Sequence, residues 1–227
     1  MTKFFRKFSV FDTVLLFIAS ACLITTAAQY PLSTTFPMGG DGAAIIRNVQ
    51  HINIRPLATL RTIVHSWYPA AYILFSINAL IPFISWPILF SWWMAFGQIL
   101  VGIALGFLCY RLAGARAAAI AIGLWALTPI TMTSFFEDGT MAQLWSLIWI
   151  TLFFERMAAK STIGMIFFAF IAFFSHPITG LMLVATLCMT VPFSWISLPN
   201  LSKNQKTIRN ILSLGMLILL AIATYVI

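Results

Sequence analysis

Apolar residues come in long runs along this chain, separated by short polar segments. Most runs approach the roughly 20 apolar residues that a helix needs to cross a bilayer. A helix also satisfies every backbone polar group inside such a run. The pattern therefore predicts apolar elements over about 11–29, 69–85, 86–110, 117–133, 138–155, 157–175, 178–197 and 210–227.

The one sizeable polar stretch, 30–68, carries two amphipathic patterns. Apolar residues share one helical face over 45–52, opposite Arg47, and a second pattern covers 57–64, with Pro56 between the two. Apolar residues at helical spacing with polar residues opposite them predict short helices that lie flat in a membrane interface. We expect these interfacial helices in the first loop outside the cytoplasm.

Composition strengthens the membrane interpretation. The 227 residues are 61% hydrophobic and 8% charged, whereas a soluble domain carries about a quarter charged residues. The expected fold class is all-α: a polytopic transmembrane helical bundle that forms one module over 1–227. The basic residues are scattered singly, with no stripe that would follow a phosphate backbone, so no nucleic-acid partner is predicted.

The basic residues indicate topology, because cytoplasmic loops of membrane proteins are rich in Lys and Arg. Element 69–85 is short and polar, and we predict a half-buried helix that does not span. With a cytoplasmic N-terminus this gives seven spans and places ten of the 13 basic residues inside. An eight-span arrangement with the N-terminus outside gives the same charge count, so charge leaves both open. The basic tail before the first run favours seven.

Only five acidic residues occur in the chain, and three of them lie at the ends of apolar runs. Asp41 follows the first run, and Glu137 and Asp138 precede a later one. A carboxylate at a membrane boundary is costly unless it is solvated, paired or functional. In the seven-span arrangement all three lie on the extracytoplasmic side, whereas eight spans would separate Asp41 from Asp138.

The order of these motifs resembles the GT-C superfamily of integral-membrane glycosyltransferases, which includes aminoarabinose transferases and protein mannosyltransferases. In that pattern an Asp follows the first span, two interfacial helices come next, and a second acidic residue opens a later span. The matching segments are Gly40-Asp41-Gly42, Trp67 to Tyr72, Tyr110-Arg111-Leu112, Glu137-Asp138-Gly139 and Ser175 to Gly180.

The resemblance implies a seven-span module in the plasma or inner membrane that works on the cell envelope. It implies a sugar donor carried on a polyprenyl phosphate, and transfer to a glycan, lipid or protein acceptor on the extracytoplasmic face. Members of the superfamily continue with further spans. The chain is therefore also expected to be one part of a longer enzyme, a minimal member, or a module whose missing spans a second chain supplies.

Asp41 is the predicted catalytic residue. Glycosyl transfer with inversion needs a base that takes a proton from the attacking acceptor, and a positioned carboxylate can do this. A structural alternative is a helix N-cap, since Asp is favoured there.

Glu137 and Asp138 are the second pair of candidates. They can orient the acceptor, or hold a divalent cation together with Asp41 through oxygen ligands. Alternatively they cap the helix that follows, whose N-terminus favours negative charge. The sequence leaves metal dependence open.

The departing lipid phosphate needs cations or hydrogen-bond donors. Arginine suits this role through its paired N–H groups, although arginines near an interface also extend along apolar surface without any ligand. Tyr68 is a further candidate, for stacking on the sugar, and His176 has a competing interpretation as a structural donor. The candidates for substrate binding are Arg47, Arg55, Arg61, His65, Tyr68 and His176.

Two other functions compete. A transporter would use buried acids as an ion path, but these acids lie at the ends of the runs. A non-catalytic membrane scaffold, or a truncated relative, is the other alternative.

Overall fold

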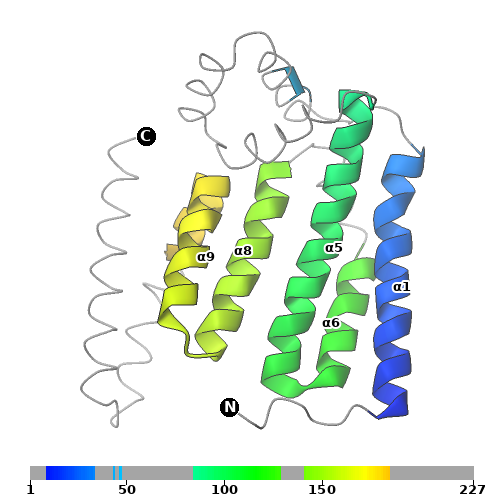
Figure 1. The fold of residues 1–227 in the computed structure, drawn as a ribbon, viewed down its shortest axis with the longest axis vertical. Helices are drawn as coiled ribbons and strands as arrows, with labels where there is room; N and C mark the ends of the chain where they lie inside the picture. The colour runs from blue at the N-terminus through cyan, green and yellow to red at the C-terminus, as the bar shows by residue number, and fades with distance from the viewer. Residues whose placement is uncertain (1–8, 34–42, 44–45, 48–83, 129–140, 185–227) are drawn as a thin grey trace.

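The computed structural model describes residues 9–33, 43, 46–47, 84–128 and 141–184 (Figure 1). Within these residues every regular element is a helix and no strand is present, which confirms the all-α class for this part of the chain. The helices are α1 (Val10–Ser33), α5 (Trp86–Ala113), α6 (Ala115–Leu127), α8 (Met141–Ala158) and α9 (Thr162–Ser175), and residues 177–184 are also helical.

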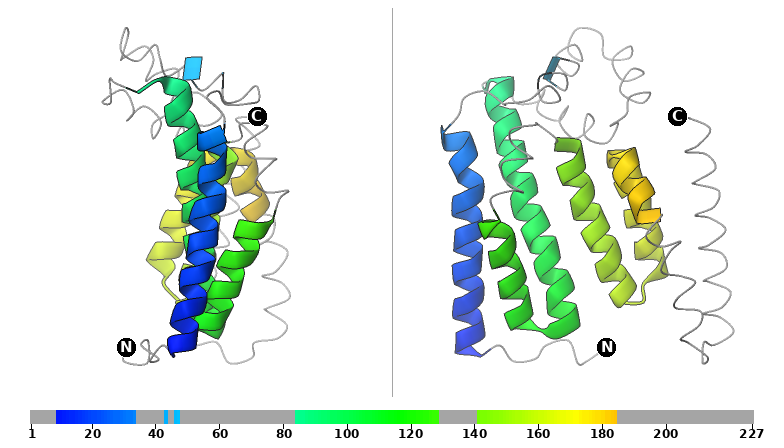
Figure 2. Two further views of the ribbon diagram at one scale, coloured as in Figure 1. Left: turned by 90° about the vertical axis from the view of Figure 1, so that its right-hand side faces the viewer. Right: turned by 180° about the vertical axis from the view of Figure 1, so that it is seen from behind.

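The helices lie side by side in a bundle whose neighbours in space are α1 with α6, α6 with α5, α5 with α8 and α8 with α9. Helices α1, α6 and α9 run upward in Figure 1, and α5 and α8 run downward. Figure 2 shows the bundle from the side and from behind, and α1 also packs against α5. The bundle therefore has a lower end, where α1 begins and α5 ends, and an upper end, where α5 and α8 begin.

Two tight turns close the lower end. Gly114, with φ of 90°, joins α5 to α6, and this left-handed backbone costs glycine little because it has no Cβ. Residues 159–161 join α8 to α9, with Lys160 at φ of 57°. Short connections of this kind make each pair antiparallel.

Two apolar clusters hold the bundle together. The larger one joins α5 to α8 through buried residues such as Phe90, Met94 and Leu144. The smaller one joins α1 to α6 around Ala19, Leu23, Ala119, Ile122 and Ala126. Small residues at an interface let helix backbones approach closely, which is the packing typical of membrane helices.

Two of the described helices are long and apolar enough to cross a membrane by length and composition, Val10–Gln29 within α1 and Trp86–Ala113. Helices α6 and α9 are apolar but shorter. Helix α1 also turns large apolar side chains away from the bundle; Phe17 is 74% exposed and Leu32 is 74% exposed. An exposed apolar helix face marks contact with lipid or with another protein.

Each described helix lies on a predicted apolar run, and the two largest differences are at the end of α6 and the start of α9. Helix α6 ends at Leu127 instead of 133, because Thr128 is extended at φ −84° and ψ 103°, the conformation that the following Pro129 favours. Helix α9 begins at Thr162 instead of 157, because the turn at 159–161 interrupts the apolar run. The predicted elements 69–85 and 210–227 lie outside the described residues, apart from Ile84 and Ser85.

Candidate functional site

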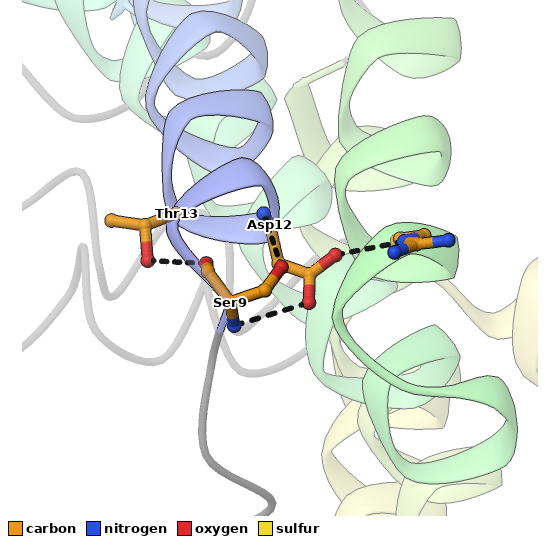
Figure 3. A network of polar contacts seen from close by, with 4 residues as sticks. Ser9, Asp12 and Thr13 are labelled. Carbon is orange, nitrogen blue, oxygen red and sulfur yellow. Dashed lines mark hydrogen bonds and ion pairs between the residues drawn. The ribbon is translucent and has the colours of Figure 1, made fainter.

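The lower end of the bundle gathers basic residues from three helices, α5, α6 and α8. Ser9 and Asp12 form a capping box at the start of α1: the Ser9 hydroxyl accepts from the Asp12 N–H at 3.1 Å, and the Asp12 carboxylate accepts from the Ser9 N–H at 3.3 Å (Figure 3). This arrangement satisfies two donors that the first helical turn leaves unpaired. Asp12 also accepts from Arg116 Nε of α6 at 2.9 Å.

That ion pair fixes the relative direction of α1 and α5. It joins the start of α1 to the start of α6, directly after α5 ends. Helices α1 and α5 are therefore antiparallel, as the seven-span arrangement requires, whereas the eight-span alternative requires them to be parallel. The total of seven spans remains a prediction, because several predicted spans lie outside the described residues.

A second acidic residue at the lower end, Glu155, is nearly buried at 3% exposure. Its carboxylate accepts from Arg111 Nε of α5 at 2.5 Å and from Arg156 Nε, its neighbour in sequence. Among the described residues, then, both acids lie at helix ends and both pair with arginine. Glu155 lies at the end of the predicted apolar run 138–155, and its position beside Arg156 marks it in the sequence as a candidate for an ion pair, although its partner Arg111 is not evident there.

The upper end carries the segments that adjoin the predicted catalytic acids. The short helical turn at 46–47 lies beyond the start of α5 and α8 (Figure 1). Ile46 is 8% exposed and belongs to the same apolar cluster as Leu89, Phe90 and Met141. Ile46 follows Asp41 by five positions and Met141 follows Asp138 by three. The chain therefore returns to one end of the bundle shortly after each acid.

Two of the predicted substrate-binding residues fall within the described residues. Arg47 is helical and exposed while its neighbour Ile46 is buried, as the amphipathic pattern predicted. His176 lies after the last residue of α9, where α9 approaches the upper end. The remaining candidates, Asp41, Arg55, Arg61, His65, Tyr68, Glu137 and Asp138, lie outside the described residues.

His176 has a structural role in which its ring caps the helix at 177–184. Its Nδ1 accepts from the backbone N–H of Thr179 at 3.1 Å and lies 2.5 Å from the Thr179 hydroxyl. The backbone of His176 is extended, and Pro177 occupies the first helical position, where proline is favoured. Because Nδ1 is an acceptor here, the proton of the neutral ring lies on Nε2.

Several polar side chains that no sequence motif marks are buried between α5, α8 and α9. Gln98 and Ser146 are fully buried at 0% exposure, and the Ser146 hydroxyl donates to the Ala172 carbonyl at 3.2 Å. The Trp125 ring N–H of α6 donates to the backbone carbonyl of Gln98 in α5 at 3.0 Å. Bonds of this kind join neighbouring helices in membrane bundles.

No group of three or more His, Cys, Asp or Glu side chains that could hold a metal ion occurs within the described residues. The predicted cation ligands Asp41, Glu137 and Asp138 lie outside them. The chain matches no protein-family profile, no curated protein and no solved structure.

Proposed function

We propose that this chain is an integral-membrane glycosyltransferase that moves a sugar from a polyprenyl-phosphate donor to an acceptor on the extracytoplasmic face. The observation that carries the proposal is the burial of Ile46 in the cluster that also contains Met141. The chain positions shortly after Asp41 and Asp138 converge on one end of the bundle, which favours a shared site for the two acids. The antiparallel packing of α1 and α5 supports the same arrangement.

The proposed reaction is a single displacement. Asp41 takes the proton of the acceptor hydroxyl while the acceptor oxygen forms a bond to the anomeric carbon of the sugar. The bond from that carbon to the phosphate oxygen breaks, and its electron pair leaves with the polyprenyl phosphate. Inversion at the anomeric carbon follows, because the acceptor attacks from the face opposite the leaving group.

The cationic residues of the first loop would stabilise the departing phosphate. Arg47 is exposed near the upper end, and Arg55 and Arg61 follow in the same loop. Donors placed where negative charge develops lower the barrier for its departure. Glu137 and Asp138 would orient the acceptor or complete a cation site with Asp41.

Asp41→Asn tests the proposed base. We expect this variant to insert and fold but to lose sugar transfer, because the amide cannot accept the acceptor proton. The measurement is release of polyprenyl phosphate from a panel of polyprenyl-phosphate sugars by the purified protein in lipid nanodiscs. Asp138→Asn should slow release at least about tenfold, which corresponds to roughly 1.4 kcal/mol of transition-state stabilisation.

Asp12→Asn is the matched control. It removes a carboxylate at the opposite end of the bundle, where Asp12 pairs with Arg116, so release should stay near the wild-type rate. Wild-type turnover by Asp41→Asn would sink the base assignment. Wild-type turnover by Asp138→Asn would reduce that residue to a helix cap.

A further inference from the structure

The buried carboxylate at the lower end holds two guanidinium groups together. Glu155 is 3% exposed, while the side chains of Arg111 and Arg156 are 22% and 39% exposed. The carboxylate lies inside the protein and the two arginines lead from it toward the surface. We propose that this Arg111–Glu155–Arg156 cluster is a binding site for the phosphate group of an anionic phospholipid.

The charge and donor count of the cluster support an anionic ligand. Two guanidinium groups and one carboxylate carry a net charge of +1. Each guanidinium has five N–H donors, whereas a carboxylate offers about four acceptor positions. Glu155 accepts from Nε of each arginine, so an anion at this point meets guanidinium groups from two helices. Phosphate is the anion whose oxygens match paired arginine donors best.

The cluster is fixed by the packing of two helices. Arg111 lies in the last turn of α5 and Arg156 in the last turn of α8, which pack against each other. The stem of Arg156 crosses Gly164 of α9, where an added Cβ would lie 2.7 Å from Arg156 Cδ. Arginine in the last turn of a helix also offsets the helix dipole, but that role does not require a buried carboxylate between two arginines.

The surroundings favour a lipid over free phosphate. Large apolar side chains next to the cluster are exposed: Leu112 is 66% exposed, Met157 is 42% exposed and Ile163 is 85% exposed. These residues offer contact to acyl chains beside a phosphate-binding group. Basic sites between helices at the cytoplasmic side recognise the head groups of anionic lipids, and the lower end is the side that the positive-inside rule assigns to the cytoplasm.

The decisive variant is Glu155→Gln. It distinguishes a site in which Glu155 holds the two arginines in place from general attraction between the basic end of the bundle and an anionic lipid. It raises the net charge by one, so attraction between the whole basic end and an anionic lipid should strengthen. Lipid binding at a site that depends on Glu155 should instead weaken, because the two guanidinium groups lose the carboxylate that holds them together. We expect at least about fivefold weaker binding of phosphatidylglycerol, against about fivefold tighter binding if only charge matters.

Arg156→Gln and Arg116→Gln form a matched pair that tests the lipid site even if Glu155→Gln does not fold. Both remove one positive charge at the lower end, but only Arg156 belongs to the cluster. Arg156→Gln should weaken binding at least about tenfold, because it removes half of the paired donors. Arg116→Gln should change it less than about threefold, because an exposed charge outside the site is screened.

The experiment is a titration of the purified full chain in detergent with phosphatidylglycerol, followed by native mass spectrometry, with phosphatidylcholine as the neutral comparison. Equal losses in the two arginine variants, or equal binding of the two lipids, would overturn the proposal. Displacement of the lipid by millimolar inorganic phosphate would assign the site to free phosphate instead. The proposed lipid site does not depend on sugar transfer, because it lies at the lower end of the bundle, opposite the end that carries Ile46.

Discussion

His176 ends α9 and caps the next helix through its ring. The sequence suggested two roles for this residue, a structural donor or a contact to the lipid phosphate. In the structure Nδ1 accepts from the backbone N–H of Thr179, so the structural interpretation is supported, although the ring acts as an acceptor at this nitrogen. The role in substrate binding remains a prediction.

Substitutions at His176 separate the two roles. His176→Asn keeps an acceptor at the cap, so we expect near wild-type thermal stability, whereas His176→Ala should cost about 1 kcal/mol. Thermal unfolding of both variants in detergent measures this difference. Sugar transfer by His176→Asn at the wild-type rate would assign the residue to the cap alone, and equal stability of the two variants would contradict the cap.

At the scale of the elements, glycines set how closely the helices approach. An added Cβ at Gly102 of α5 would lie 2.5 Å from Leu23 Cδ2 of α1, and one at Gly106 would lie 2.8 Å from Ile122 Cδ1 of α6. Two glycines four positions apart on one helix allow the close contact that membrane helices use. Their spacing was visible in the sequence, but their partners were not, because no local pattern specifies which helices become neighbours.

Gly180 and Gly123 provide a matched pair for this packing. A Cβ at Gly180 would lie 2.6 Å from the backbone Cα of Phe173, whereas a Cβ at Gly123 would have Ala19 Cβ at 4.0 Å as its nearest contact. Gly180→Ala should therefore destabilise the protein by about 1–3 kcal/mol. Gly123→Ala should be neutral or stabilising, because alanine favours helix. Thermal unfolding of both variants checks this, and a tolerated Gly180→Ala would contradict the packing of 177–184 against α9.

The apolar runs predicted the existence of the described helices well and their ends less well. Helices α5 and α8 continue beyond the runs to Ala113 and Ala158, because Arg111 and Arg156 are good helix formers and offset the dipole in the last turn. The early end of α6 depends on Pro129, whose effect on Thr128 was available from the sequence. The ion pair of Glu155 with Arg111 was not available from the sequence, because Arg111 is distant in the chain and meets Glu155 only through the packing of α5 against α8.

At the scale of the whole molecule, the bundle has two chemically different ends. The lower end gathers Arg111, Arg116, Arg156 and Lys160 around two paired acids. The upper end carries Ile46, Arg47 and the starts of α5 and α8. The seven-span arrangement predicted this division, which charge alone left open, and the antiparallel order of α1 and α5 agrees with it. The catalytic assignment of Asp41 and Asp138 remains a prediction, since both lie outside the described residues.

The most direct test of the account is the side of the membrane on which the two acids lie. Single cysteines at positions 41, 138 and 160, on a background without Cys22, Cys109 and Cys188, are probed with an impermeant thiol reagent on intact cells. We predict that positions 41 and 138 label from outside and that position 160, at the basic end, does not. Labelling of only one of the two acid positions would place the acids on opposite faces, and the proposal of a shared transferase site would then be wrong.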